Sequence, residues 1–508
     1  MSEFHELPDL ASERLGGAVL WANDDFFAEK ENLLHAAAPV WKEGAYTDRG
    51  KWMDGWESRR RRVPGHDECI VRLGLPGVVR GVIIDTAFFR GNYPDMASIE
   101  CAVARADATV EELLSDRTEW VALLPQVKLA GDSKNRFALP DNARLATHLR
   151  FHIYPDGGVA RLRVHGLVMP DWRTLGDGGD PLDLAALENG AVSLACSDMF
   201  FGERQNLILP GRAPNMGDGW ETRRRRSPGC DWNLVELATI GVVERLIVDT
   251  DHFKGNYPDT CSVEGILRPG ATAEALKDAP FVEVLAQTKL QAHTRHEFTD
   301  ALLSRGPFSH LRLKVYPDGG VSRLRAWGRA TPDGLCRARL ARLSTLSPAA
   351  AESELLVACG SHTFARAVAA ARPFHSTDAL TSAADAAFAS MTDDDWREAF
   401  AAHPKIGERK AKVDTGALAR AFASGEQRGA DGASDETRAA LATLNADYEE
   451  RHGFVFLICA TGRTADEMLA ELRARVARDT ADEIATAKIE QKKITQLRIR
   501  KMLGEAPR

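Results

Sequence analysis

Hydrophobic and polar residues alternate with a period of two in many short segments of the first two thirds of the chain. In the segment HLRLKVY, Leu311, Leu313 and Val315 alternate with polar neighbours. This alternation is typical of a strand that has one buried face. The turn signal PDGG follows, and VSRLRAW then resumes the alternation. We therefore predict a β-hairpin over residues 310–328.

Two other segments are almost continuously hydrophobic. VVRGVIIDT (78–86) and VVERLIVDT (242–250) are rich in β-branched residues. Such runs predict strands that are buried on both faces. Several short strands with turn signals between them indicate β-sandwiches.

The hydrophobic period changes beyond about Ser344, where alanine becomes abundant and the spacing becomes helical. Thr464 with Glu467, and Thr480 with Glu483, match the capping box that opens many helices. After the second pair, apolar residues fall broadly on one helical stripe, namely Ile484, Ile489, Ile494, Leu497 and Leu503. We therefore predict an all-α bundle for the C-terminal part.

The β-rich part contains an internal duplication. DGWESRRRRVPGHD (54–67) returns as DGWETRRRRSPGCD (218–231). VVRGVIIDTAFFRGNYPD (78–95) returns as VVERLIVDTDHFKGNYPD (242–259) at the same offset of 164 residues. The two copies therefore share one fold, and the Gly- and Asp-rich segment 175–190 links them.

Three domains follow from these patterns. A chain of 508 residues suits three hydrophobic cores better than one, and its 44% hydrophobic and 27% charged residues are those of an ordinary globular protein. We predict a first β-sandwich over residues 15–168, a second over 190–330 and an all-α domain over 345–508.

Charge and cysteine content exclude several classes of protein. The net charge of −8 argues against a general nucleic-acid-binding protein. The eight cysteines form no CxxC pair, which indicates neither a disulfide framework nor a zinc ribbon and fits a reducing compartment. The N-terminal segment lacks the features of a signal peptide, and no apolar run approaches the ~18 residues that a membrane span needs. We therefore expect a cytoplasmic protein that contacts neither nucleic acid nor membrane.

A histidine lies at a predicted helix end in the C-terminal part. Pro404 disfavours helical backbone at the residue before it, so the segment FAAHPKIGE ends a helix at His403. Imidazole is well suited to moving a proton near neutral pH. The segment ASGEQRGAD adds Glu426 and Gln427, and FLICATGR adds backbone amides and Arg463.

Together these segments resemble the ureidoimidazoline decarboxylase family over about 160 residues. The resemblance implies decarboxylation of 2-oxo-4-hydroxy-4-carboxy-5-ureidoimidazoline (OHCU) to (S)-allantoin. It implies His403 and Glu426 as the catalytic residues, with His403 exchanging the proton at the reacting carbon. The substrate-binding residues that it implies are Pro404, Gln427, Phe456, Leu457, Ile458, Cys459, Ala460 and Arg463. No metal and no organic cofactor is implied.

The chain departs from that family at one place. The family usually has a serine three residues before the glutamate of the EQ motif, whereas here Ala423 has that place and the serine is Ser424. One hydrogen bond of the site is therefore left open.

Each β-rich copy contains four consecutive arginines, at 59–62 and 223–226. A charged run is usually a solvated strand or loop, but both runs follow Gly-Trp-Glu and precede Pro-Gly, and this fixed setting favours anion binding. The histidines do not support a metal site. His148 and His152 share a strand face, yet four residues of strand span ~13 Å, too far for one ion. In the second copy, Lys314 replaces His152.

The doubled DGWE-RRRR-PG-D and F-x-GNYPD motifs resemble those of the allantoicase family over about 320 residues. The resemblance implies two jelly-roll-like sandwiches and hydrolysis of allantoate to (S)-ureidoglycolate and urea. Arginines can bind the carboxylate of allantoate, and carboxylates can bind its ureido N–H groups. The substrate-binding residues that we expect are Glu57, Arg59, Arg60 and Asp67 in the first copy and Glu221, Arg223, Arg224 and Asp231 in the second.

The sequence leaves open which general acid or base helps urea to leave. Both copies share the candidate pairs Asp54/Asp218, Glu57/Glu221, Asp67/Asp231, Asp85/Asp249 and Lys128/Lys289. The copies also differ, because His66 corresponds to Cys230, and His293 and His296 occur only in the second copy. One copy can therefore be catalytic without the other.

Two hypotheses about the whole chain follow. We favour a bifunctional enzyme of ureide breakdown that acts on small-molecule ureides, as a homo-oligomer and without cofactors. The alternative is a decarboxylase that carries a non-catalytic sandwich pair for ligand binding or oligomerisation. Release of urea from allantoate distinguishes the two.

Overall fold

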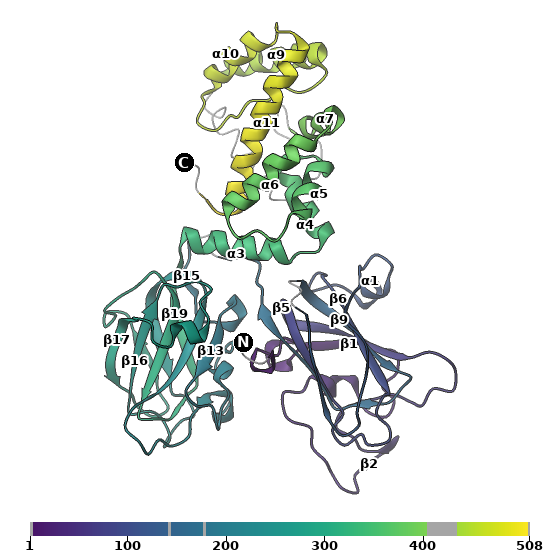
Figure 1. The fold of residues 1–508 in the computed structure, drawn as a ribbon, viewed down its shortest axis with the longest axis vertical. Coiled ribbons are helices and arrows are strands. Elements are labelled where there is room, and N and C mark those ends of the chain that lie inside the picture. Colours follow the sequence, from purple (N-terminus) through teal and green to yellow (C-terminus); the bar gives the residue numbers. More distant parts are fainter. Residues whose placement is uncertain (1–3, 141–143, 176–178, 404–433, 506–508) are drawn as a thin grey trace. The chain divides into compact units, whose positions relative to one another are not determined.

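The computed structural model describes residues 4–140, 144–175, 179–403 and 434–505. It forms two compact units, Met1–Leu335 and Cys336–Arg508. The first unit is rich in strands and the second is helical (Figure 1). This arrangement confirms the predicted multidomain fold class of two β-sandwich repeats followed by a helical part.

A 19-residue strand organises each repeat, namely β5 (Asp67–Asp85) in the first and β15 (Asp231–Asp249) in the second. The first half of β5 pairs with β1 (Ala18–Ala22) and β9 (Leu145–Tyr154), and its second half pairs with β8 (Lys134–Ala138) and β11 (Arg161–Val168). The first half of β15 pairs with β13 (Val192–Cys196) and β19 (Phe308–Tyr316), and its second half pairs with β18 (Arg295–Phe298) and β21 (Arg323–Ala330). One long strand therefore pairs with four others in each repeat, two along each half.

The remaining strands extend these ladders or form small pairs. The outer strands are β6 (Met96–Ala102) and β7 (Val121–Lys128) in the first repeat, and β16 (Thr260–Ile266), β17 (Val282–Lys289) and β12 (Leu182–Asp183) in the second. The small pairs are β2 (Tyr46–Thr47) with β3 (Gly50–Lys51), β4 (Trp56–Glu57) with β10 (Gly158–Val159), and β14 (Trp220–Glu221) with β20 (Gly320–Val321). Each repeat also has one short helix, α1 (Val110–Leu114) or α2 (Ala273–Leu276).

The predicted hairpin over residues 310–328 is wrong. Its two strands exist as β19 and β21, and side-chain burial alternates along β19 from Leu311 onward, as the hydrophobic pattern predicts. In the described sheets, however, β19 and β21 pair with different halves of β15 and not with each other. The segment between them, β20, pairs with β14. Alternation therefore identified the strands but not their partners.

The almost continuously hydrophobic segments are buried as predicted. Residues 81–86 are all buried, and so are residues 246–250. They form the second halves of β5 and β15, where ladders run on both sides.

Each repeat also buries one histidine at a corresponding place. His148 of β9 and His310 of β19 are fully buried. Nδ1 of each lies 2.9 Å from the hydroxyl of the preceding residue, Thr147 or Ser309. Burial lowers the pKa of both imidazoles to about 4, and the Arg72 cation adds to this effect for His148.

We expect acid to destabilise the first unit through these two histidines. The unfolded imidazole takes up a proton near pH 6.5, whereas the folded one does so only near pH 4. Their contribution is therefore fully present above pH 6.5 and is lost as the pH falls toward 4. The loss amounts to about 3 kcal/mol for each histidine.

Denaturant unfolding of the full chain at several pH values measures this loss. Tryptophan fluorescence reports on the first unit, because every tryptophan except Trp396 lies there. His148→Asn retains a polar group near the Nδ1 position but does not titrate, so it should show a weaker pH dependence than the wild type. An equal pH dependence would contradict the assignment.

The second unit consists of helices. They are α3 (Pro332–Thr345, which begins in the first unit), α4 (Pro348–Cys359), α5 (His362–Ala370), α6 (Thr377–Ser390), α7 (Asp393–Ala401), α9 (Asp435–His452), α10 (Ala465–Arg475) and α11 (Thr480–Met502). Within the described residues, none of the helices combines the length and the apolar character of a membrane span.

One of the two predicted capping boxes is confirmed. The Thr464 hydroxyl accepts the Glu467 N–H, and the Glu467 carboxylate accepts the Thr464 N–H, at the start of α10. The second box is wrong, because α11 is capped by Asp479, which accepts the Ala481 N–H.

The predicted apolar stripe of α11 is buried at Ile494 and Leu503 but wrong at Ile489. Ile489 is 55% exposed, whereas polar side chains account for much of the buried face. The buried polar residues are Glu483, Glu490, Gln491, Thr495 and Arg498. A polar stripe at helical spacing on a buried face indicates a site rather than a simple core.

Candidate functional site

His403 lies just beyond the end of α7. A capping box of Thr392 and Asp395 starts this helix, which ends at Ala401. The His403 N–H then donates to the Phe400 carbonyl at 3.2 Å. The helix therefore ends before His403, as Pro404 predicts. Other predicted residues of this site lie outside the described residues, namely Pro404, Glu426 and Gln427, together with Ala423 and Ser424.

The imidazole of His403 has one shielded nitrogen. His403 is half-buried, and its Nε2 is closed to solvent and has no hydrogen-bond partner in the described part of the chain. Burial holds the pKa of His403 well below its ordinary value. The Arg498 cation lowers it further, and Gln491 acts in the opposite direction. The imidazole is therefore neutral at neutral pH.

Gln491 and Arg498 are site residues that the sequence analysis missed, and both come from the polar stripe of α11. The Gln491 Nε2 donates to the Cys359 carbonyl at 3.1 Å and to the Thr495 hydroxyl at 3.2 Å. These two bonds fix the carboxamide, whose Oε1 is buried and unpartnered among the described residues. Unsatisfied buried polar atoms are rare in folded proteins. His403 Nε2 and Gln491 Oε1 are two such atoms, and they point to a place for a polar ligand.

The predicted pocket segment, Phe456 to Ala460, follows α9. Phe456, Leu457 and Ile458 are buried, and Cys459 and Ala460 are half-buried. Its backbone is held from two helices, because Arg475 donates to the Leu457 carbonyl at 2.9 Å and the Cys459 N–H donates to the Glu490 carboxylate at 2.8 Å.

A buried ion pair supports this segment. The Arg475 Nε donates to the Glu483 carboxylate at 2.7 Å, and the Tyr448 hydroxyl donates to the same oxygen at 2.7 Å. The Arg475 guanidinium also lies 4.7 Å from the centre of the Phe456 ring. Burial, followed by the Glu483 charge, raises the pKa of Tyr448, so its hydroxyl stays protonated. Arg475 and Glu483 are therefore positioning residues for the segment.

Arg463 lies at the surface. Its N–H donates to the Ala460 carbonyl at 3.1 Å, in the turn before α10, and its side chain is exposed. Among the described residues no carboxylate pairs with its guanidinium. The charge of Arg463 is thus available to an anion.

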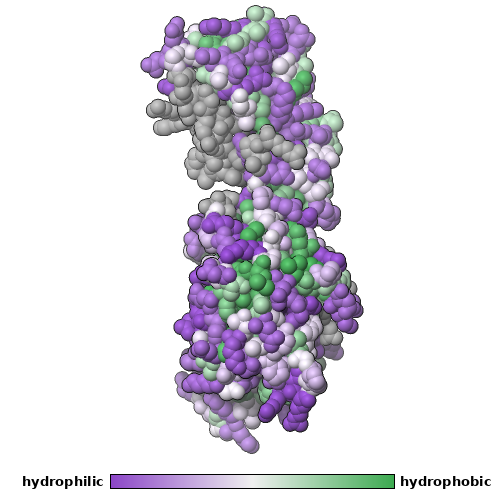
Figure 2. Space-filling view, turned by 90° about the vertical axis from the view of Figure 1, so that its left-hand side faces the viewer, coloured by the Kyte–Doolittle hydropathy of each residue, from purple (hydrophilic) through white to green (hydrophobic). Residues whose placement is uncertain are grey.

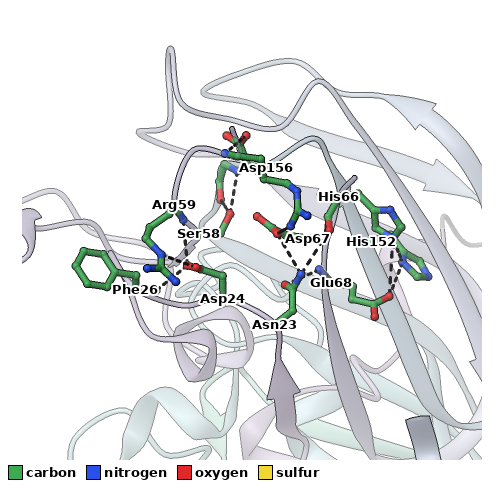
Figure 3. A network of polar contacts seen from close by, with 12 residues as sticks. Asn23, Asp24, Phe26, Ser58, Arg59, His66, Asp67, Glu68, His152 and Asp156 are labelled. Carbon is green, nitrogen blue, oxygen red and sulfur yellow. Dashed lines mark hydrogen bonds and ion pairs between the residues drawn. The ribbon is translucent and has the colours of Figure 1, made fainter. Parts of the chain in front are cut away.

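In the first repeat, the arginine run is anchored at its first member (Figure 3). The Arg59 Nε donates to the Asp24 carboxylate at 2.6 Å, and its guanidinium lies 5.1 Å from the centre of the Phe26 ring. Burial acts to raise the pKa of Asp24, but hydrogen bonds from Phe26 and Arg59 outweigh it and lower the pKa. Arg59 is therefore held by an ionised partner.

The third arginine of the run is also paired, and the sequence analysis did not single it out. The Arg61 Nη1 donates to the Asp67 carboxylate at 2.6 Å, and Asn23 donates to the same oxygen at 3.1 Å. Asp67 is 1% exposed. Its charge is balanced by Arg61, which makes the pair part of the local framework.

The second and fourth arginines of the run differ from the first and third. Arg60 and Arg62 are exposed, and no carboxylate of the described chain pairs with either. Glu57, just before the run, is half-buried and accepts a hydrogen bond from Asn92 at 2.7 Å. Burial raises the pKa of Glu57, with Asn92 acting against it. The run thus combines two exposed cations with a preceding carboxyl whose pKa burial raises.

The second repeat has the same framework. Its corresponding contacts are Arg223 with Asp198 (3.0 Å), Arg223 with the Phe200 ring (5.2 Å), Arg225 with Asp231 (2.5 Å) and Asn256 with Glu221 (2.5 Å). Arg224 is exposed like Arg60. The duplicated sequence therefore repeats the geometry as well.

Several shared acidic residues hold the backbone and the core. Asp54 binds the buried Arg161 with both oxygens at 2.9 Å, and in the second repeat Asp218 accepts from the buried Arg323 through Oδ2. Asp85 accepts the Ala87 N–H at 2.9 Å, as Asp249 accepts that of Asp251. Lys289 pairs with Asp259 at the surface. These contacts favour structural roles over proton transfer.

Comparisons with known proteins agree with this geometry. Residues 8–169 and 182–331 match the model of the allantoicase repeat, and residues 344–500 match that of OHCU decarboxylase. A protein of Pseudomonas fluorescens (strain SBW25) named "Probable allantoicase" is 48% identical over 331 residues, which are 65% of this chain and 98% of that protein. The crystal structure of allantoicase from Saccharomyces cerevisiae is 35% identical, with a TM-score of 0.52 over 64% of this chain and 93% of that one.

Proposed function

Because this chain belongs to the allantoicase family and carries an OHCU decarboxylase domain behind its two repeats, we propose a role for each group described above. The chain is a bifunctional enzyme of allantoin degradation, a hydrolase in the first unit and a carboxy-lyase in the second. The hydrolase converts allantoate to (S)-ureidoglycolate and urea, and the lyase converts OHCU to (S)-allantoin.

The shielded, unpartnered Nε2 of His403 carries the proposal for the lyase. A neutral imidazole can act as a base, and this one has its free nitrogen in a place that water does not reach. Exclusion of water also prevents a competing proton donor from reaching the reacting carbon. His403 thus combines a free lone pair with the shielding that stereospecific protonation needs.

The proposed step accounts for two protons. As the carbon–carboxylate bond breaks and carbon dioxide leaves, its electron pair passes into the ring and onto an imidazoline nitrogen, which takes up a proton from solvent, while His403 accepts the proton of the substrate's 4-hydroxyl group. The imidazolium then returns that proton to one face of the adjacent ring carbon, which becomes the (S) centre of allantoin. Gln491, which acts against the lowering of the His403 pKa, would stabilise the imidazolium between the two transfers. Backbone groups of the segment 456–460, Arg463, Glu426 and Gln427 would hold the substrate.

The pH dependence of decarboxylation tests the environment of His403. A general base works only while unprotonated, so the rate should fall as the pH falls through the pKa of His403, which lies well below 6.5. Arg498→Gln removes a cation that lowers this pKa, and should therefore move the acid limb of the profile to higher pH. Arg500→Gln on the same helix is the matched control and should leave the limb in place. A limb that does not move in Arg498→Gln would contradict the role of Arg498.

The exposed Arg60 and the half-buried Glu57, three residues apart in the sequence, carry the proposal for the hydrolase. Allantoate has one carboxylate and two ureido groups on one carbon, so a free guanidinium can bind the anion. Urea leaves more readily when its nitrogen is protonated, and Glu57 is a carboxyl that burial biases toward its protonated form. Glu57 is therefore proposed as the general acid, and Arg59 and Asp67 as framework residues for Arg60.

Removing the charge of Arg60 should weaken substrate binding. A charge-assisted hydrogen bond contributes about 1.5–3 kcal/mol, so Arg60→Gln should raise KM for allantoate by about 10- to 100-fold. Arg62→Gln is the matched control, because Arg62 is also exposed and pairs with no carboxylate among the described residues. Equal effects of the two variants would show a general field of positive charge rather than a specific contact.

One measurement separates the two hypotheses for the first unit. Incubation of the purified chain with allantoate should release urea and ureidoglycolate. Without product, the sandwich pair would be a binding or oligomerising platform, and the decarboxylase would stand unaffected. The two reactions are not consecutive, because allantoin must be opened to allantoate between them. The fusion is therefore better explained by joint production of two enzymes than by channelling.

We also propose that the chain works in the cytoplasm and as a homo-oligomer. Hydrophobic side chains gather on part of the face of the first unit that Figure 2 turns toward the viewer. Exposed apolar side chains of the second repeat include Leu267, Val282 and Leu303. Apolar patches of this kind favour subunit contacts. Sedimentation of the purified chain measures its oligomeric state directly.

A further inference from the structure

Three metal-ligating side chains of the first repeat converge at a place that the proposed chemistry does not use. Glu68 of β5 and His152 of β9 lie directly opposite each other in the antiparallel ladder. His66 immediately precedes β5, and its ring turns toward His152 (Figure 3). His148 and His152, which share one strand, are too far apart for one ion. The potential ligands beside His152 come instead from β5 and the residue before it.

The distances suit a single ion. His66 Nε2 lies 3.0 Å from His152 Nδ1, His152 Nδ1 lies 3.0 Å from Glu68 Oε2, and His66 Nε2 lies 3.8 Å from Glu68 Oε2. Zinc binds imidazole nitrogen and carboxylate oxygen at about 2.0–2.2 Å, which places tetrahedral ligands roughly 3.3–3.6 Å apart. A point about 2 Å from all three atoms lies within their triangle. We propose that His66, Glu68 and His152 bind one divalent transition-metal ion of the zinc type.

A second carboxylate fits this assignment. His152 Nε2 lies 3.1 Å from Glu100 Oε2. A metal-bound histidine typically donates its other ring N–H to a carboxylate, which fixes the tautomer and orients the ring. Because Glu100 accepts the Nε2 proton, Nδ1 of His152 presents its lone pair to the ion. The His66 side chain is 36% exposed, so a fourth position of the ion is open to water or another small ligand.

The second repeat has lost these ligands. Cys230 and Trp232 stand where His66 and Glu68 stand in the first repeat, and Lys314 replaces His152. The acidic partner remains as Glu264, but Lys314 and Arg312 both pair with it. A protonated lysine offers no lone pair, and Trp232 offers no ligand atom in place of the Glu68 carboxylate. The site therefore belongs to the first repeat.

The second repeat contains another group of potential ligands, Asp251, His252 and His293, which serves as a control. Its converging atoms already have partners in the protein. His252 Nε2 donates to the Ala213 carbonyl at 2.8 Å, and His293 Nδ1 accepts the His252 N–H at 2.8 Å. Asp251 pairs with Arg212 at 2.6 Å. We therefore expect no ion at this second group.

Calorimetric titration of the chelator-treated full chain with zinc chloride tests the proposal. The wild type and His293→Ala should bind one more tightly held ion than His66→Ala and Glu68→Gln. Glu100→Gln should retain the ion but bind it about 10- to 100-fold more weakly. Cobalt(II) gives a second readout, because a visible absorption band of the four-coordinate ion should be missing in His66→Ala.

Each outcome of these titrations either supports or overturns the proposed metal site. Equal zinc stoichiometry in the wild type, His66→Ala and Glu68→Gln would overturn the proposal, and so would loss of the ion in His293→Ala alone. Glu68→Gln preserves the shape of the side chain, and circular dichroism shows whether each variant is folded. Neither readout depends on urea release, so the metal site and the proposed function fail or hold separately.

Discussion

His403→Ala should abolish enzymatic formation of (S)-allantoin while urea release from allantoate continues. Proton transfer by a positioned side chain contributes about 10²- to 10⁴-fold to a rate, and we expect a loss of this size. The effect should appear in kcat, because alanine removes the proton carrier and leaves the segment 456–460, Gln491 and Arg498 to bind substrate. Stereochemistry should be lost as well, since solvent protonates both faces of the ring carbon.

The same chain supplies the control for this variant. Urea release depends on the first unit, which forms a compact unit by itself, so an intact hydrolase rate shows that the protein was produced and folded. His403→Gln adds a second test, because glutamine can donate and accept hydrogen bonds but cannot carry a proton between two atoms. Unchanged decarboxylation in either variant would remove His403 from the proposed role.

The position of His403 was predictable because its signal is local. A proline directly after a residue restricts that residue's backbone, so Pro404 alone predicted the helix end. The capping box at Thr464 was equally local, and the structure confirms it. The box at Thr480 failed because its glutamate had a stronger partner. Glu483 is buried with Arg475, a contact that no local pattern can reveal.

The missed residues of the lyase site share a different property. Gln491, Thr495 and Arg498 follow one another at helical spacing, on the face of α11 that is buried. A pattern of apolar residues predicts the buried face of a helix, and this pattern gives no signal for polar residues that are buried. A run of polar residues at helical spacing, opposite an exposed Ile489, was the available signal.

The β-rich repeats show the same limit. Alternation located β19 and β21, but strand partners depend on the long β15 that both of them contact. The sequence could not show which of the four consecutive arginines can bind substrate. The structure distinguishes them, because Asp24 and Asp67 form ion pairs with Arg59 and Arg61. Arg60 and Arg62 are exposed.

Glu57→Gln should lower the rate of urea release by about 10²- to 10⁴-fold, the usual contribution of a general acid. Glutamine has no proton to give to the leaving nitrogen, yet its carbonyl oxygen can still accept the Asn92 hydrogen bond. The loss should therefore appear in kcat with little change in stability. Measurement of urea with time at saturating allantoate, together with thermal unfolding, checks both parts.

Glu221→Gln is the matched substitution in the second repeat, where Asn256 makes the equivalent contact. Burial raises the pKa of Glu57 in the first repeat, and Glu57 is the carboxyl proposed as the general acid. We therefore expect Glu221→Gln to release urea at nearly the wild-type rate. Equal losses in both variants would mean two working sites, and a loss in Glu221→Gln alone would move the catalytic role to the second repeat. Either result would exclude Glu57 as the single general acid, whereas a loss confined to Glu57→Gln would assign hydrolysis to the first repeat.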